Sequence, residues 1–236
     1  MQTLFSALLF ISFCMMSCNE GQIERNDSKQ ETTIETIKHP LKLRDDTLLM
    51  PLTTNTAWFF DIAYQDIETG TFLRPTAEFP FPQSDTLYVN GSTMLDSNPC
   101  SLIRTSAAPK GGTWYTIRQK GVYSWPQDPE DTTEVPVFSL TYKYPARKGE
   151  TYTSNGIKVE VRDTAANISV PAGSFSCFYY VSFSKAPGNV MFENHVWLSK
   201  GFGMVRNEAI MHQKDIAPVR RIVTLRRFIH GTEQKQ

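Results

Sequence analysis

Residues 168–208 constrain the fold more than any other part of the chain. An apolar or aromatic residue recurs at every second position along 175–183, and along 190–198 at every second position except Asn194. Successive side chains of a β-strand point to opposite faces, so this period of two predicts half-buried strands. The segments APGN at 186–189 and GFG at 201–203 separate the runs and are typical of tight turns. The stretch therefore predicts three successive antiparallel strands that form the scaffold of the domain.

The same alternation predicts strands along the rest of the domain. The clearest runs are 56–67, 101–106, 113–118, 121–125, 137–144, 204–210 and 219–229. Pro and Gly recur along 69–83, where we expect a loop with a short strand at most. The last strand carries two pairs of arginines, which are typical of an exposed sheet edge protected by charge.

Four short glycine-containing segments predict turns between these strands. Asn90-Gly91 and Asn155-Gly156 each lie between strand-like runs. Because Asn-Gly supplies the two positive-φ residues of a type I′ turn, we expect a hairpin around each pair. Gly111-Gly112 and Lys120-Gly121 predict two further turns.

Little in the chain predicts helix. No window combines the spacing of an amphipathic helix with its capping residues, so we allow one or two short helices at most, around 41–50 or 93–100. About a dozen short strands without an internal repeat favour one continuous sheet. The sequence therefore predicts an all-β domain built on a single strongly curved antiparallel sheet or incomplete barrel.

The N-terminus has the features of a bacterial lipoprotein. An uncharged, mostly apolar run at 4–16 is too short to span about 30 Å of hydrocarbon but suits a signal peptide. The run ends at Ser17-Cys18, which resembles a lipobox, the motif in which the Cys thiol is acylated. We therefore expect a signal peptide at 1–17 and a lipid on Cys18. The alternative is an apolar helix packed into the domain.

The segments after Cys18 differ sharply in composition. Residues 18–40 are polar and charged, so we expect a lipidated Cys followed by a flexible tether. The β-rich domain follows at 41–231, and 232–236 form a disordered tail. Asn19, where a retention signal would have Asp, favours the outer membrane. We expect an envelope protein anchored in that membrane and facing the periplasm or the cell surface.

The charge balance argues against a nucleic-acid partner. The chain has 24 Lys and Arg against 24 Asp and Glu, so it offers no electrostatic attraction for nucleic acid. The contact with the membrane that we expect is the lipid on Cys18, which acyl chains can hold stably.

Two cysteines, Cys100 and Cys177, remain in the β-rich domain. An oxidising compartment permits a disulfide between them, but two thiols without a spacing motif fix no pairing. The alternative is that each is a small buried hydrophobe, because Cys177 falls in register with Phe175 and Tyr179. Both interpretations stay open at the level of sequence.

No catalytic, cofactor or metal motif is present in a recognisable form. No Ser or Cys lies in a nucleophile frame, and Gly201-x-Gly203 lacks the third Gly and the βαβ context of a dinucleotide site. The histidines are isolated, although His195 could form a hydrogen bond in a pocket beside Trp197. The acidic cluster at 128–134 lacks the spacing of a calcium loop. We predict a non-enzymatic protein without a cofactor or metal.

Aromatic side chains are the remaining indication of a binding site. A curved sheet can line an apolar pocket with such residues. The set that we expect to contact a ligand is Trp58, Phe60, Tyr64, Trp114, Tyr180 and Trp197. The alternative is that these residues pack in the core and on the strand surfaces, because aromatic residues favour strands in any case.

Two segments resemble a known family. VPAGSFSC at 170–177 and GFGMVR at 201–206 are similar to a pattern in uncharacterised lipoproteins of the Bacteroidetes type, Val-Pro-Ala-Gly-Thr/Ser-Phe-x-Cys followed by Gly-x-Gly-x-Val-Lys/Arg. With the upstream YPARKGETY, the likeness covers about 144–208. Those proteins resemble the LolA/LolB-type envelope carriers, in which a curved sheet forms an incomplete barrel around an apolar hollow.

The resemblance implies a function of the carrier type. It implies a membrane-anchored envelope lipoprotein that binds a lipid or another apolar small molecule in the concavity of its sheet. The alternative is a structural or protein-interaction module that binds an envelope protein and takes no small-molecule ligand.

Overall fold

The computed structural model describes residues 48–77, 80–126, 135–187, 190–214 and 216–231. Cys18, the predicted signal peptide and tether, the acidic cluster at 128–134 and the C-terminal tail lie outside these residues. The described residues form strands and no helix. The strands are β1 (Ala57–Asp66), β2 (Phe72–Leu73), β3 (Ser84–Leu95), β4 (Asn98–Thr105), β5 (Ala108–Arg118), β6 (Gly121–Pro126), β7 (Ser139–Lys143), β8 (Thr151–Ser154), β9 (Ile157–Val170), β10 (Gly173–Ala186), β11 (Val190–Ser199), β12 (Gly203–Gln213) and β13 (Ile216–Ile229).

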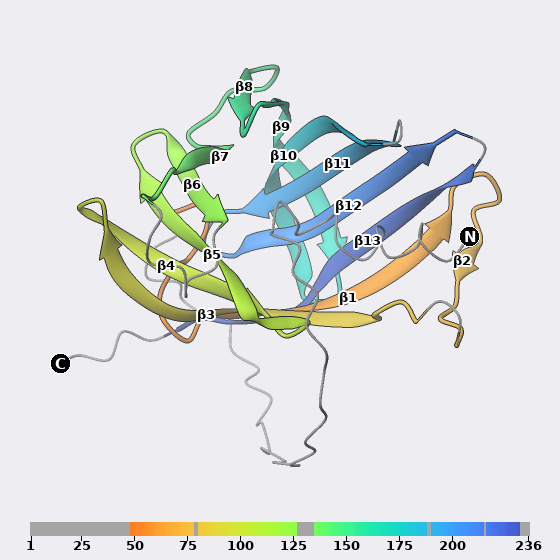
Figure 1. The fold of residues 1–236 in the computed structure, drawn as a ribbon, viewed down its shortest axis with the longest axis horizontal. Coiled ribbons are helices and arrows are strands. Elements are labelled where there is room, and N and C mark those ends of the chain that lie inside the picture. The colour runs from red at the N-terminus through yellow and green to blue at the C-terminus, as the bar shows by residue number, and fades with distance from the viewer. Residues whose placement is uncertain (1–47, 78–79, 127–134, 188–189, 215, 232–236) are drawn as a thin grey trace, which may run out of the picture.

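All thirteen strands belong to one antiparallel sheet, which confirms the predicted fold class. The order is β7-β6-β5-β4-β3-β1-β13-β12-β11-β10-β9-β8, with β2 paired to β1. The first and last strands of this order, β7 and β8, follow each other in the chain. The sheet therefore curls until its two ends approach, and it forms a nearly closed barrel shape (Figure 1).

Strand β1 shows why these residues form a barrel-like sheet. Trp58, Phe60, Ile62 and Tyr64 are buried and alternate with partly exposed residues, as the sequence predicts for 56–67. This face packs inside the curved sheet, where apolar residues from strands at both ends of the chain meet in one core. Leu49, from the segment before β1, is also buried there.

The seam between β7 and β8 is closed by side chains. Tyr152 Oη donates a hydrogen bond to the carbonyl of Thr141 at 2.8 Å. Tyr180 Oη donates to the carbonyl of Lys143, also at 2.8 Å. Lys143 in turn forms an ion pair with Glu150 at 2.5 Å. Edge carbonyls of β7 that lack a neighbouring strand are thus satisfied by tyrosine hydroxyls, which accords with the general pairing of buried backbone groups.

The two predicted Asn-Gly hairpins have opposite outcomes. Asn155 (φ 47°) and Gly156 (φ 78°) form the turn between β8 and β9, which confirms that prediction. Asn90-Gly91 was wrongly predicted as a turn, because β3 continues through it with a register shift between Val89 and Gly91. The chain reverses at Asp96-Ser97 instead, where both residues have positive φ. The longer pairing allows Val89 to lie opposite Ile103, and both are buried.

The predicted turn at Gly111-Gly112 is also wrong, since both glycines lie inside β5. The turn between β4 and β5 falls earlier, and Thr105 pairs with Ala108. The Asp85 carboxylate fixes this turn by accepting hydrogen bonds from the hydroxyls of Thr105 and Ser106. A side-chain carboxylate on a neighbouring strand therefore decides the turn, and the local sequence does not reveal it.

The last strand is not the sheet edge that its arginines indicate. Strand β13 lies between β1 and β12 near the middle of the strand order. Its arginines pair with carboxylates on these neighbours, Arg226 with Asp61 and Arg220 with Glu208, each at 3.6 Å. The charges thus form cross-strand ion pairs rather than guard an edge.

The stretch 168–208 contains the three predicted strands, and its β9–β10 hairpin also packs across the sheet. Beyond the end of β11, the β9–β10 hairpin crosses toward β13, where the Ala172 N–H donates to the Leu225 carbonyl at 3.1 Å. This crossing encloses a small second core of Cys177, Trp197 and Val205. The hairpin that carries the family-like motif is therefore a packing element.

Candidate functional site

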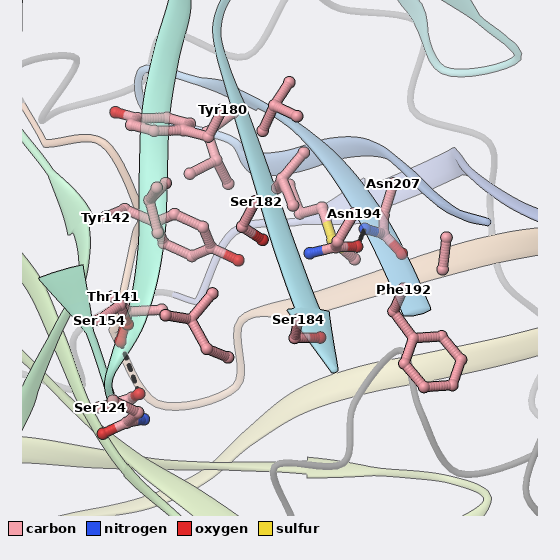
Figure 2. Close-up of a pocket in the computed structure, with 18 of the residues that line it drawn as sticks. Ser124, Thr141, Tyr142, Ser154, Tyr180, Ser182, Ser184, Phe192, Asn194 and Asn207 are labelled. Carbon is pink, nitrogen blue, oxygen red and sulfur yellow. Dashed lines mark hydrogen bonds between the residues drawn. The ribbon is translucent and has the colours of Figure 1, made fainter. Parts of the chain in front are cut away.

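A cavity of about 410 Å³ opens on the concave side of the sheet. This volume lies within the range of about 300–1,000 Å³ that is usual for small-molecule sites. The wall draws on strands from both halves of the chain, mainly β5 to β7 on one side and β9 to β12 on the other (Figure 2). The nearly closed sheet therefore creates a site that no single segment of the sequence contains.

One part of the cavity wall is apolar. Its side chains come from β3, β4, β9, β11 and β12 and from the segment before β1. They are Met50, Leu87, Ile103, Ile157, Val159, Phe192, Val196, Leu198 and Met204. Most of them are buried in the main core, so this part of the wall continues the apolar interior of the domain. A surface of this kind suits an alkyl chain, because contact removes apolar area from water.

Polar side chains are set among these apolar residues, and an asparagine pair on β11 and β12 is the most connected of them. Asn207 on β12 donates a hydrogen bond from Nδ2 to Asn194 Oδ1 on β11 at 2.7 Å. The same Nδ2 donates to the carbonyl of His195 at 3.1 Å. Ser182 and Ser184 on β10 and Ser154 on β8 line the cavity as well. Figure 2 shows Tyr142, Ser182 and Asn194 with their polar ends directed into the same part of the cavity.

Tyrosines contribute both ring surface and hydroxyl groups to the wall. The rings of Tyr142 and Tyr180 lie with centroids 5.5 Å apart. Burial raises the pKa of Tyr142 to about 12 and raises the pKa of Tyr115 and Tyr180 as well. These phenols therefore stay protonated and uncharged at neutral pH. The hydroxyls of Tyr115 and Tyr142 form no hydrogen bond with any of the described residues.

The cavity wall is almost free of charge. Of the described residues that line it, Lys185 alone is charged, and its side chain is exposed. Among the described lining residues there is no carboxylate and no histidine. Acid–base or nucleophilic chemistry of the usual kinds would need such groups in reach of a bound molecule.

The aromatic set from the sequence is mostly placed elsewhere. Tyr180 lines the cavity, whereas Trp58, Phe60 and Tyr64 are buried in the main core without reaching the cavity wall. Trp114 lies between Thr113 and Tyr115, both of which line the cavity, so its own side chain points to the opposite face.

Trp197 is likewise on the outer face of the sheet. It stacks on Tyr179 with ring centroids 4.6 Å apart. His195 joins this outer group, with Nδ1 2.6 Å from Tyr179 Oη and Nε2 2.9 Å from a Glu193 oxygen. The imidazole of His195 thus forms its contacts on the outer face of the sheet, away from the cavity.

Sequence reasoning missed the polar residues of the cavity, although a signal for them was present. Asn194 falls on the same strand face as Phe192 and Val196, and Ser182 on the same face as Phe178 and Tyr180. A polar residue in an inward register is unusual in a core and must find a partner. The polar residues at inward positions, Asn194 and Ser182, indicated the site better than the aromatic residues did.

Cys100 and Cys177 do not form the disulfide that the sequence left open. Both thiols are free and buried. Cys100 lies on β4 opposite Thr93, and Cys177 lies on β10 opposite Ala166, so they belong to distant parts of the strand order. Each acts as the small buried hydrophobe of the alternative interpretation.

In the ranges that the structure describes, no three His, Cys, Asp or Glu side chains gather closely enough to hold a metal ion. Those ranges also contain no helix that is long and apolar enough to cross a membrane.

Comparisons with known proteins identify no family for this chain. No protein-family model matches the sequence, and no curated protein matches it. A solved structure from Bacteroides fragilis, assigned as an exported protein with a YMCC-like fold, is 12% identical, with a TM-score of 0.44 over 76% of this chain and 98% of that one. A structure from Parabacteroides distasonis, assigned as a lipoprotein, is 16% identical, with a TM-score of 0.41 over 79% of this chain and 100% of that one. At this level of similarity neither says what this chain binds.

Proposed function

We propose that this chain is a lipid-anchored, non-enzymatic protein of the cell envelope that binds an amphipathic small molecule. The single observation that carries the proposal is the cavity of about 410 Å³, whose wall combines apolar side chains with uncharged polar ones. A ligand with an alkyl part and a polar part would use both kinds of contact, by apolar burial and by hydrogen bonding.

Binding can be tested with the full chain carrying Cys18→Ser, which prevents acylation. Native mass spectrometry of the purified protein should show a co-purified ligand of amphipathic character. A fluorescent fatty-acyl probe should then bind with one-to-one stoichiometry after the ligand is removed. A clean apo mass together with no uptake of the probe would refute the binding proposal.

The anchor is tested separately in cells. Cys18→Ala should move the protein from the membrane fraction to the soluble fraction, because a single thiol carries the expected lipid. Cys14→Ala is the matched control and should leave fractionation unchanged. Membrane retention of Cys18→Ala would count against the lipoprotein assignment without touching the binding proposal.

A second candidate is a protein-interaction module. Phe183, Met191 and Ile216 are 50%, 43% and 38% exposed, and they lie near the two turns that join β10 to β11 and β12 to β13. Exposed apolar residues of this kind can contact a protein partner. Cross-linking in cells that depends on these residues, without a bound ligand, would favour this candidate.

A further inference from the structure

Resting on the proposed function, we infer that the cavity selects a ligand with an uncharged, hydroxyl-bearing head group, as in a monoacylglycerol. Asn194 is the residue that determines this selection. Some hydrogen-bonding groups of the wall are bonded to other protein groups, and others have no partner among the described residues and can bind a ligand.

The orientation of the Asn194 amide is fixed by its neighbour. Asn207 Nδ2 lies 3.1 Å from the His195 carbonyl, which can only accept, so this atom must be the nitrogen. The same nitrogen donates to Asn194 at 2.7 Å, which requires that the atom it meets be Oδ1. Asn194 therefore keeps Nδ2 as a donor, and this group forms no hydrogen bond within the described part of the chain.

The groups around Asn194 Nδ2 are hydroxyls. Ser182, Ser184 and Tyr142 line the same cavity, and none of their hydroxyls has a hydrogen-bond partner among the residues that the structure describes. A hydroxyl both donates and accepts. The wall thus offers one fixed amide donor and several hydroxyls that can either donate or accept. A glycerol-type head can bond to them through its own hydroxyls and its ester carbonyl.

A charged head would fit this wall poorly. A carboxylate or phosphate that leaves water needs a cation or several fixed donors in exchange. Lys185 is the one cation among the described lining residues, and its side chain is exposed, so it would meet an anion in water rather than in the cavity. A cationic head would find no carboxylate among the lining residues that the structure describes.

The test compares three ligands that share one oleoyl chain. Monooleoylglycerol, oleate and oleoyl-lysophosphatidate would each displace an apolar fluorescent dye from the full chain carrying Cys18→Ser, at mildly alkaline pH where the carboxylate is ionised. We expect monooleoylglycerol to bind at least about tenfold more tightly than either anion. Equal or tighter binding of oleate or of the lysophosphatidate would overturn the inference and leave the proposed function standing. Failure of all three to displace the dye would overturn the proposed function itself.

Asn194→Asp tests the assigned residue. It keeps the oxygen that accepts from Asn207 and replaces the free donor with an oxygen, so the fold should be retained. Monooleoylglycerol affinity should fall by about tenfold, while dye binding stays within about twofold of the parent. Asn167→Asp, on the exposed face of β9, is the matched control and should change neither value.

Asn194→Ser provides a second variant that introduces no charge. Its shorter side chain cannot place a donor at the position of Nδ2, so it should show the same loss of preference for the neutral head. If both Asn194 variants bind dye and retain the parent preference, the assignment of Asn194 is wrong.

Discussion

The two cysteines of the domain show how burial sets the chemistry of single residues. Cys177 is fully buried, and burial raises the pKa of its thiol to about 12. Burial also raises the pKa of Cys100. The thiolate is the reactive form. Both cysteines are therefore protected from reagents, because they are buried and because they stay protonated.

We expect neither thiol to react with an alkylating reagent in the folded protein, and both to react after denaturation. Mass spectrometry counts the added groups. Ser184→Cys, placed in the cavity wall, is the positive control and should react in the folded state. Rapid labelling of Cys177 without unfolding would show that its cluster opens readily.

The tyrosines whose pKa burial raises make the folded state less stable at alkaline pH. Tyr142 has an ordinary pKa of about 10, which burial raises to about 12 in the folded state. Between these values the unfolded chain ionises first, so stability falls as pH rises from about 10 toward about 12. Tyr115, Tyr152 and Tyr180 shift in the same direction and add to the effect.

Tyr142→Phe should therefore move the alkaline unfolding midpoint to higher pH. At neutral pH the variant should change stability little, because the hydroxyl has no partner among the described residues. Circular dichroism across an alkaline titration measures both values. A midpoint that stays at the parent value would contradict the assigned burial of this phenol.

Single residues were predicted with uneven success, for a physical reason. The inward alternation of β1 is local and could be predicted from the residues themselves. Whether Trp58 fills a core or lines a hollow depends on residues far along the chain, such as Phe202 and Phe228, which a local pattern cannot report. The role of Asn194 depends on its cross-strand contact with Asn207, which the alternation within β11 does not show.

At the scale of elements, β6 and β7 meet at a contact that tolerates no side chain. Gly121 has φ 134°, and a Cβ on it would lie 2.1 Å from the Tyr142 carbonyl oxygen. Gly121 pairs with Lys143, so this close approach is what places β7 and the seam.

Gly121→Ala should destabilise the protein by about 1–3 kcal/mol, because β7 must move to relieve the clash. Gly111→Ala in β5 is the matched control, since a Cβ there meets nothing within 4 Å, and it should stay within about 0.5 kcal/mol of the parent. Denaturant unfolding measures both. An equal effect of the two substitutions would contradict this account of the contact.

Strands were easier to predict than their connections. The period-two pattern predicted β1, β10 and β11, because burial of one strand face produces this pattern within the strand itself. Turn positions failed at Asn90-Gly91, where β3 continues its pairing with the next strand, β4, and at Gly111-Gly112, where the Asp85 carboxylate fixes an earlier turn. The crossing of the β9–β10 hairpin over β12 and β13 has no local signal either.

At the scale of the whole molecule, the sheet curls because its two ends are consecutive in the chain. Strands β7 and β8 approach, and tyrosine hydroxyls from β8 and β10 satisfy the edge carbonyls of β7. The curl leaves a cavity instead of a filled core where polar residues face inward from β10 and β11. Curvature could be predicted from the sequence, but the hollow could not, because it depends on the sum of many side-chain volumes.

The central claim is that this cavity holds the alkyl part of a ligand, and a photoreactive ligand tests it most directly. A neutral-headed lipid with a diazirine near the end of its chain would be bound, activated and mapped by mass spectrometry. We predict saturable labelling of residues in the apolar wall, such as Val159, Val196, Leu198 and Met204. Labelling confined to exposed outer-face residues such as Phe183, or labelling that never saturates, would contradict the account.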